Sequence, residues 1–213
     1  MQQRSIVRLG VPLAVAALAL SACGSRDAGT SSTAAGTKTV KIGVIAPLSG
    51  GLSALGLGIK NSVALAVKQA NDSNAIAGWK FEVAAEDDEA KPETGKNAAT
   101  KLSSDDAVLG VVGTLNSSVA QSTVPVLAAA NIAQVSPANT NPSLTQGADA
   151  AAKKRPYANY FRTCTTDAVQ GPFAAQYLLS VGIKSVATIH DKKTYGQGLV
   201  DAFTAEFTKG GGT

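Results

Sequence analysis

Residues 108–140, VLGVVGTLNSSVAQSTVPVLAAANIAQVSPANT, decide the fold of this chain. They contain two short apolar runs, 108–112 and 132–135, in which valine and isoleucine do not alternate with polar residues. Such runs are typical of strands that are buried on both faces of a parallel sheet. Residues 117–130, between the runs, have the length and composition of a helix, with Pro125 as a local flaw. The stretch therefore predicts a strand–helix–strand unit.

The loops 113–118 and 136–140 follow the two predicted strands and should emerge at the same edge of the sheet, where open α/β sheets bind ligands. Asn116, Ser117 and Ser118 are good N-cap residues for the predicted helix, whose free N–H groups and positive dipole end favour a small anion such as a carboxylate. The second loop consists of Ser136, Pro137, Ala138, Asn139 and Thr140, and it adds carbonyl groups and a hydroxyl that are suited to an ammonium group. The two loops together predict a site for a zwitterion.

Composition excludes several classes of protein. The chain has 213 residues, of which 45% are hydrophobic and 16% charged, as in a globular protein. Its formal charge of +4 is not arranged as a basic stripe with aromatic residues, so nucleic acid is not an expected partner. Cys23, Cys164 and the single His190 are too few for a disulfide framework or the usual zinc sites. Gly56 and Gly58 lack the third glycine of a dinucleotide loop, and we expect neither a metal nor a cofactor.

The amino terminus has the features of a secretory signal. Arg4 and Arg8 precede the apolar run 11–20, which is too short to cross a membrane and is followed by small residues. Residues 20–23, LSAC, look like the bacterial lipobox, in which the cysteine is lipidated and becomes the first residue. We therefore predict a signal peptide at 1–23 with Cys23 as the lipid attachment site, and a flexible tether at 24–38. The protein is expected outside the cytoplasmic membrane, anchored to it by lipid.

Strands and helices alternate along the rest of the chain. We predict strands at 40–46, 79–85, 159–163 and 184–190, and helices at 56–70, 92–102, 167–181 and 198–209. This order predicts an α/β fold, a doubly wound parallel sheet with helices on both faces. Only a helix, a strand and a helix follow Arg162, too little for a second sheet, so we infer a fragment of a two-domain protein.

Three polar stretches contain clusters of ionisable residues. Residues 86–89, EDDE, lack the glycine turn and alternation of a calcium loop, and we interpret them as a solvated loop between a strand and a helix. The polar insertion 147–157 contains Lys153, Lys154 and Arg155 and is interpreted as a solvated loop, with a contact for a partner protein as the alternative. A third stretch, His190 followed by Asp191, raises the possibility of a nucleophilic triad.

The enzyme hypothesis is the weaker one. The chain has no G-x-S-x-G elbow, and His190 is expected to be a structural histidine at the end of a buried strand. Cys164 has no second histidine to activate it, so we interpret it as a small core or hinge residue. The sequence therefore favours a binding protein over an enzyme.

Six short motifs occur in an order that characterises one family: IGVIAPLSG at 42–50, GTLNSS at 113–118, SPANT at 136–140, FRT at 161–163, Asp167 with QGP at 170–172, and HDKKTYG at 190–196. By these motifs the chain resembles the leucine/isoleucine/valine-binding periplasmic proteins. These are the type I substrate-binding subunits of branched-chain amino acid ABC importers. The resemblance implies two α/β lobes that close over an amino acid and deliver it to a membrane permease.

The same resemblance implies roles for single residues. Residues 39–161 would form the first ligand-binding lobe and 162–213 part of the second, in a protein expected to be monomeric. Ser117 matches the hydroxyl that binds the ligand carboxylate, Ala138 (through its carbonyl) and Thr140 match the pair that hold carboxylate and ammonium groups, and Tyr195 matches a tyrosine that closes over the ligand.

The chain departs from the family pattern at three points. Leu55 stands where the family has an aromatic residue, Asn116 stands at one position of a disulfide found in some relatives, and the acidic residue that completes ammonium binding would lie beyond Thr213. Two alternatives therefore stay open. The same fold could bind short amides, urea or aromatic acids, or the chain could be a truncated fragment that binds nothing.

Overall fold

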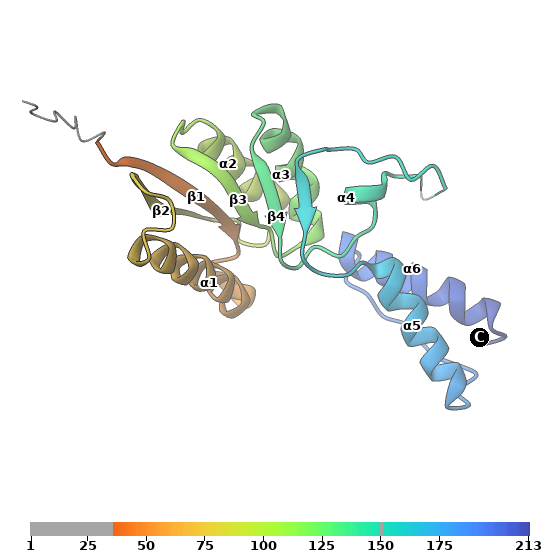
Figure 1. Ribbon diagram of the computed structural model, residues 1–213. Helices are drawn as coiled ribbons and strands as arrows, with labels where there is room; N and C mark the ends of the chain where they lie inside the picture. The colour runs from red at the N-terminus through yellow and green to blue at the C-terminus, as the bar shows by residue number, and fades with distance from the viewer. Residues whose placement is uncertain (1–35, 150) are drawn as a thin grey trace, which may run out of the picture. The chain divides into compact units, whose positions relative to one another are not determined.

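The structure is a computed structural model that describes residues 36–149 and 151–213 (Figure 1). The predicted signal peptide, Cys23 and the predicted tether as far as residue 35 lie outside the described residues. The strands of the described part are β1 (Lys38–Ala46), β2 (Trp79–Asp87), β3 (Val108–Gly113), β4 (Ala133–Ser136) and β5 (Tyr160–Arg162). Its α-helices are α1 (Ser53–Asp72), α2 (Pro92–Ser103), α3 (Ser117–Ala129), α4 (Ser143–Gln146), α5 (Asp167–Ser180) and α6 (Thr194–Lys209).

The five strands form one sheet in the order β2-β1-β3-β4-β5, and all neighbouring pairs are parallel. Val44 on β1 lies opposite Val112 on β3, and the same Val112 lies opposite Val135 on β4. Apolar residues therefore run across the middle of the sheet, as expected for a parallel sheet that is covered by helices. The predicted class, an α/β fold with a parallel sheet and helices on both faces, is confirmed.

Helices lie on both faces of the sheet (Figure 1). On one face, α2 and α3 pack against each other and over a cluster of buried residues that includes Ile45, Leu102, Val111 and Leu127. Each fully buried side chain of this kind contributes about 1.5–3 kcal/mol by its removal from water. On the other face, α1 packs on β1 and β2, and Asn71 at its end hydrogen-bonds to both the N–H and the carbonyl of Phe81.

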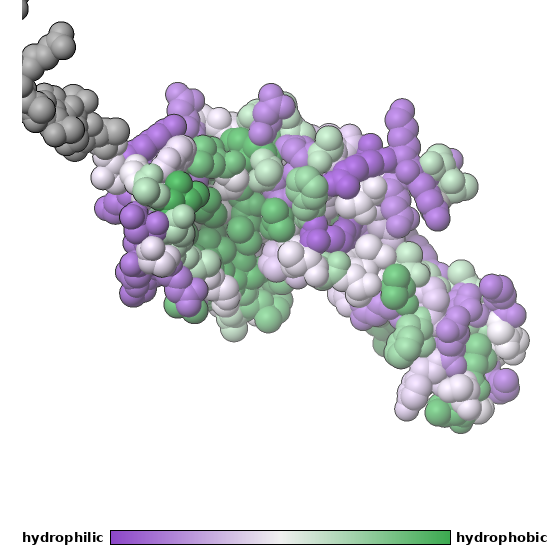
Figure 2. Space-filling view, in the orientation of Figure 1, coloured by the Kyte–Doolittle hydropathy of each residue, from purple (hydrophilic) through white to green (hydrophobic). Residues whose placement is uncertain are grey.

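One face of the sheet is less buried than the sequence predicts. We expected β3 and β4 to be buried on both sides, but Leu109 is 49% exposed and Val112 and Val135 are half-buried. Phe161 on β5 is 46% exposed on the same side as Val135. The reason is that α1 packs mainly on β1 and β2, so part of this face stays accessible within the described residues, as the apolar area in Figure 2 shows.

The predicted strand at residues 184–190 is wrong. These residues have no regular secondary structure, and the side chain of Ile189 is 94% exposed. Only the backbone of Lys184 and Val186 finds a partner, in two hydrogen bonds of 2.9 Å to Thr213. A strand needs a neighbouring strand for its N–H and carbonyl groups, and the described residues offer no sheet there. The helix after it, α6, begins at Thr194, one turn before the predicted start.

The acidic stretch 86–89 is not the wholly solvated loop that we predicted. Glu86 pairs with Lys101 at 2.7 Å, and Asp87 Oδ1 accepts the N–H groups of Leu48 and Glu89 at 2.8 Å each. Asp88 is fully buried, and its Oδ2 has no hydrogen-bond partner among the described residues. Asp87 therefore ties the loop after β1 to the loop after β2, and Glu86 ties β2 to α2, which the acidic composition alone does not reveal.

Asp88 should make the stability of the protein depend on pH. Burial raises the pKa of the Asp88 carboxyl to about 6, and the nearby Asp87 raises it further, whereas the N–H of Ala90 lowers it. An unfolded aspartate has a pKa of about 3.9, so the folded chain binds this proton more tightly. The more tightly bound proton on Asp88 therefore stabilises the folded chain fully below about pH 4, and this stabilisation is lost as the pH rises through about 6.

We expect Asp88→Asn to increase the free energy of unfolding near neutral pH by about 1–3 kcal/mol, since the amide is neutral and its oxygen can still accept the N–H of Ala90. Near pH 4 the variant and the native chain should be equally stable. Urea unfolding at both pH values measures this difference. Asp106→Asn, at an exposed aspartate, serves as the control, and an equal pH dependence in all three proteins would refute the role of Asp88.

Candidate functional site

The loops that follow β3 and β4 lie side by side at the carboxyl edge of the sheet. Ser136 Oγ donates a hydrogen bond to the carbonyl of Thr114 at 2.9 Å, and Asn139 Nδ2 donates one to the carbonyl of Leu115 at 3.0 Å. The backbone N–H of Asn141 lies 3.4 Å from Ser117 Oγ, which accepts it. The predicted meeting of these two loops is therefore observed, at the edge where open parallel sheets place their ligands.

A cavity of about 330 Å³ opens between these loops. That volume is in the range of small-molecule sites, which begin at roughly 300 Å³. The residues that line it are Leu52, Leu55, Leu115, Asn116, Ala138, Thr140 and Tyr195. They come from the turn before α1, the start of α1, the two loops and the first turn of α6. The leucines make part of the wall apolar, the other residues supply polar groups, and none of the lining side chains is charged.

Two polar atoms of the cavity wall are buried without a hydrogen-bond partner among the described residues. They are Thr140 Oγ1 and Asn116 Oδ1; the Thr140 hydroxyl lies beside the buried carboxyl of Asp167, whose pKa is raised by burial and lowered by this hydroxyl. Asn116 precedes α3 with extended backbone angles, φ −87° and ψ 131°, yet its side chain makes no capping hydrogen bond to the helix. A buried acceptor without a donor costs roughly 1–3 kcal/mol, so a ligand or water that donated to these atoms would stabilise the site.

The start of α3 supplies the complementary polarity. Asn116 is the N-cap and Ser117 the first helical residue, so the first N–H groups of the helix have no acceptor within it. The positive end of the helix dipole lies at the same place and favours a negative group such as a carboxylate. Asn116 and Thr140 line the cavity, and Ser117 follows Asn116 directly, so the start of α3 lies next to the two acceptors.

The first turn of α6 is attached by polar contacts to Asn141, just after the second loop, and to α3. Asn141 Nδ2 donates a hydrogen bond to the carbonyl of Thr194 at 3.0 Å, and Thr194 Oγ1 donates one to Gln121 Oε1 at 3.1 Å. These contacts hold the neighbouring Tyr195 at the cavity, where its side chain is 44% exposed. The aromatic ring is thus available to cover a ligand.

The predicted site residues fall into two groups. Leu55, Ala138, Thr140 and Tyr195 line the cavity. Three others do not: Ser117 is 1% exposed behind the wall, Ser118 is half-buried on α3, and Asn139 is fully buried. The side chain of Asn139 is used to fasten the loops, since it bonds to Leu115 and to the hydroxyl of Tyr160.

Sequence reasoning missed three residues of the wall: Leu52, Leu115 and Asn116. Leu115 and Asn116 lie inside the loop 113–118 that the sequence places at the edge of the sheet, and the loop itself was the available signal. The sequence identifies Asn116 as an N-cap candidate. The structure shows no capping bond from its side chain, and Asn116 Oδ1 is left without a hydrogen-bond partner among the described residues.

A second cavity of about 330 Å³ lies between α5, α6 and the irregular residues 186–189. Its wall is mostly aliphatic or aromatic, with Leu178, Leu199 and Phe203 as the larger residues. Gln170 and Thr188 are the polar residues of this wall, and neither has a buried atom without a partner. This cavity therefore lacks the convergent polar groups that define a specific small-molecule site.

The side chains of His190 and Asp191 each bond to the backbone of the turn that follows them. We expected His190 to be a structural histidine at the end of a buried strand, but it is exposed, because residues 184–190 join no sheet. His190 Nδ1 accepts the N–H of Lys192 at 3.0 Å, and Asp191 Oδ1 accepts the N–H of Lys193 at 2.9 Å. Both side chains thus support the turn that leads into α6. Among the described residues, no group of three or more His, Cys, Asp or Glu side chains is arranged to hold a metal ion.

Comparison with known proteins identifies the family of the chain. The sequence profile of the family described as "Periplasmic binding protein" matches residues 39–213. The chain is 38% identical over 173 residues to Leu/Ile/Val-binding protein homolog 3 of Brucella melitensis biotype 1, an alignment that covers 81% of this chain and 45% of that protein. The chain therefore spans about 45% of the length of this curated relative.

Two solved structures show the same fold. A leucine binding protein, LivK, from Thermotoga maritima superposes with a TM-score of 0.71 at 28% identity, over 81% of this chain and 47% of that one. A solute binding protein of an ABC transporter from Rhodopseudomonas palustris, in complex with 3,4-dihydroxy benzoic acid, superposes with a TM-score of 0.70 at 30% identity. That match covers 82% of this chain and 45% of the other.

Proposed function

Because the chain belongs to the periplasmic binding protein family, we propose that it is the substrate-binding subunit of an ABC importer. In this proposal it binds branched-chain or related amino acids outside the cytoplasmic membrane and delivers them to a membrane permease. It performs no catalysis. The observation that carries the proposal is the cavity at the carboxyl edge of the sheet, with two buried acceptors that lack partners and a helix start beside them.

The cavity suggests how an amino acid would bind. The carboxylate would lie at the start of α3, close to Ser117 and Ser118, where the N–H groups and the helix dipole favour negative charge. The ammonium group would donate hydrogen bonds to Thr140 Oγ1, to Asn116 Oδ1 and to the carbonyl of Ala138. An aliphatic side chain would then contact Leu52, Leu55 and Leu115, and Tyr195 would cover the ligand.

The organisation of the whole protein is part of the proposal. Residues 39–161 would form the first ligand-binding lobe and 162–213 the beginning of the second, with ligand binding coupled to closure of the lobes. Residues 1–23 would be a lipoprotein signal peptide, with Cys23 as the lipid-attached residue, and 24–38 a tether that lets a monomeric receptor reach the permease. The first lobe contributes all the lining residues of the cavity except Tyr195.

A second candidate keeps the site and changes the ligand to an aromatic acid, with short amides or urea as further members of this class. One relative of known structure binds 3,4-dihydroxy benzoic acid. The cavity of this chain has no charged lining side chain, so a carboxylate at the helix start with an aromatic ring against the leucines fits the same wall. An aromatic acid has no ammonium group, however, and would use the acceptors on Thr140 and Asn116 only through ring hydroxyls.

Thr140→Val tests the site. The substitution keeps the shape of the side chain and removes an acceptor for a charged donor, a hydrogen bond of about 1.5–3 kcal/mol. We expect it to weaken leucine binding by about tenfold or more in a calorimetric titration of the protein as its native gene encodes it. Thr100→Val, at an exposed threonine on α2, is the matched control and should leave the affinity unchanged.

The ligand class is tested with 4-methylpentanoate, which is leucine without its amine. If the ligand is an amino acid, the native protein should prefer leucine to this analogue, and Thr140→Val should reduce the preference. Equal affinity for both compounds, or an affinity for leucine that Thr140→Val does not change, would contradict the proposal that the ligand is an amino acid. Tight binding of 3,4-dihydroxy benzoic acid in its place would support the second candidate.

A further inference from the structure

The loop that carries Ala138 and Thr140 is held from behind by β5 and the start of α5. Arg162 Nη1 donates a hydrogen bond to the carbonyl of Asn139 at 2.6 Å, and Nη2 donates one to the carbonyl of Asn141 at 3.0 Å. Between these two, the carbonyl of Thr140 accepts the backbone N–H of Asp167 at 3.0 Å. Three successive carbonyl groups are therefore bound by a segment that does not line the cavity.

The guanidinium of Arg162 is itself fixed in place. Its Nη2 also donates to Thr145 Oγ1 at 2.9 Å, and its plane lies over the ring of Tyr160, 5.6 Å from the ring centroid. Asp167 is fully buried nearby, and burial raises the pKa of its carboxyl, against the opposite influence of Thr140 and Arg162. A planar fork with several donors can bind two carbonyls at once, whereas a lysine ammonium at the same place acts as a single point charge.

We infer that Arg162 is a positioning residue of the ligand site. It binds the carbonyls of Asn139 and Asn141, and the intervening Thr140 is thereby kept at the cavity wall. Arg162 is not among the lining residues, so it acts through Thr140 and does not touch the ligand directly. The effect on ligand affinity rests on the function proposed above, but the effect on the loop does not.

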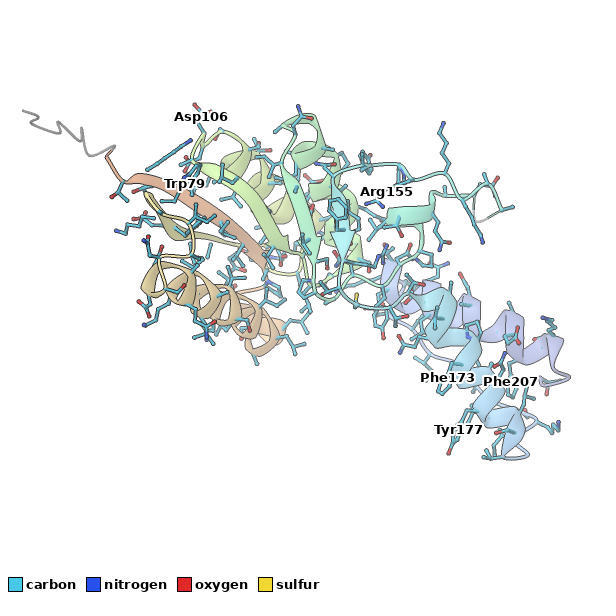
Figure 3. All side chains as sticks on the ribbon, in the orientation of Figure 1. Trp79, Asp106, Arg155, Phe173, Tyr177 and Phe207 are labelled. Carbon is cyan, nitrogen blue, oxygen red and sulfur yellow. The ribbon has the colours of Figure 1, made fainter. Side chains whose placement is uncertain are left out.

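Arg155 provides a matched control. It also donates to backbone carbonyls, from Nε to Tyr157 at 3.0 Å and from Nη2 to Tyr160, and it lies over the ring of Phe161 at 5.0 Å. Arg155 lies beside the same strand, β5 (Figure 3). Its two hydrogen bonds go to Tyr157 and Tyr160, outside residues 136–141. A lysine substitution at either position removes a guanidinium group, but only the substitution at Arg162 should loosen the loop 136–141.

Hydrogen exchange in the ligand-free protein tests the effect on the loop. We expect Arg162→Lys to accelerate exchange of the backbone amides at residues 138–141 by about tenfold or more, while Arg155→Lys leaves them unchanged. Thr145→Val is a milder variant, which removes one partner of Arg162 and should accelerate the same amides to a smaller extent. Equal exchange at residues 138–141 in the native protein and the Arg162 and Thr145 variants would overturn the inference.

Leucine titrations then test whether Arg162 affects ligand binding through the position of Thr140. Arg162→Lys should weaken binding by about tenfold and Arg155→Lys should not, and the double variant Arg162→Lys/Thr140→Val should lose no more affinity than Thr140→Val alone. Additive losses would contradict a route through Thr140. If the native protein binds no ligand, the proposed function fails, and the exchange experiment still decides whether Arg162 positions the loop.

Discussion

Gly113→Ala is expected to lower the free energy of unfolding by about 3 kcal/mol or more. Gly113 has φ +137°, a backbone conformation that residues with a Cβ rarely adopt. A Cβ at this position would lie 2.0 Å from the carbonyl oxygen of Ile45, and 3.0 Å from its carbonyl carbon. Ile45 belongs to the core of β1 and is fully buried, so neither strand can move aside without loss of packing.

The neighbouring Gly110 is the control for this prediction. It lies on the same strand, and a Cβ there would meet the carbonyl oxygen of Ala133 at 3.5 Å, an ordinary contact. We expect Gly110→Ala to change stability by less than about 0.5 kcal/mol, as most substitutions without a clash do. Urea unfolding of both variants measures the difference, and equal stability of the Gly110 and Gly113 variants would show that β1 and β3 are not packed as described.

Asn139→Leu is the second large effect, with an expected loss of about 3 kcal/mol in the free energy of unfolding. Asn139 is fully buried, and its amide donates to the carbonyl of Leu115 at 3.0 Å and accepts the hydroxyl of Tyr160 at 3.1 Å. Burial raises the pKa of Tyr160 to about 12, so its hydroxyl is protonated at neutral pH and needs an acceptor. Leucine has the same branched arrangement of side-chain heavy atoms, but it can neither donate to the carbonyl of Leu115 nor accept the hydroxyl of Tyr160.

The same substitution should also abolish ligand binding, because Asn139 joins the two loops that form the cavity. Asn97→Leu, at an exposed position on α2, is the control and should change stability by less than about 0.5 kcal/mol. Urea unfolding and leucine titration of both variants are the measurements. A loss of less than about 1 kcal/mol for the Asn139 variant would mean that the fastening of the loops is not needed for the fold.

Most of the fold could be predicted from the sequence because its signals are local. The apolar runs 108–112 and 132–135 identify β3 and β4, and Pro92 with Glu93 identifies the start of α2. The membership of the chain in the periplasmic binding protein family is also confirmed, since the family profile matches residues 39–213. Helix bounds differ from prediction by a few residues, as at α6, which begins at Thr194.

What the sequence could not predict depends on partners far along the chain. Residues 184–190 have the composition of a strand, yet they join no sheet among the described residues, since a strand exists only with a neighbour. Leu109 and Phe161 have the composition of buried residues, yet nearly half of each side chain is exposed. An apolar run predicts a strand, but it does not predict which helix will cover each of its faces.

The candidate site, like the fold, could be predicted only in part from the sequence. The two loops could be placed at one edge because parallel strands end together there. Which side chains face the cavity depends on backbone angles that composition does not reveal. Thr140 and Asn116 line the cavity with buried acceptors, whereas Asn139, one residue away from Thr140, is turned into the protein and fastens the loops. Arg162 stood in a recognised motif, but its hydrogen bonds to the loop became visible only in three dimensions.

The central claim, that the cavity beside Thr140 binds a small carboxylic acid with an amine, is tested most directly by calorimetry. The protein encoded by the native gene would be titrated with leucine, 3,4-dihydroxy benzoic acid and acetamide in turn. We predict saturable binding of one leucine per protein with a dissociation constant of about 10 μM or tighter. Binding of the benzoic acid or acetamide with no binding of leucine, or no heat from any of the three, would contradict the claim.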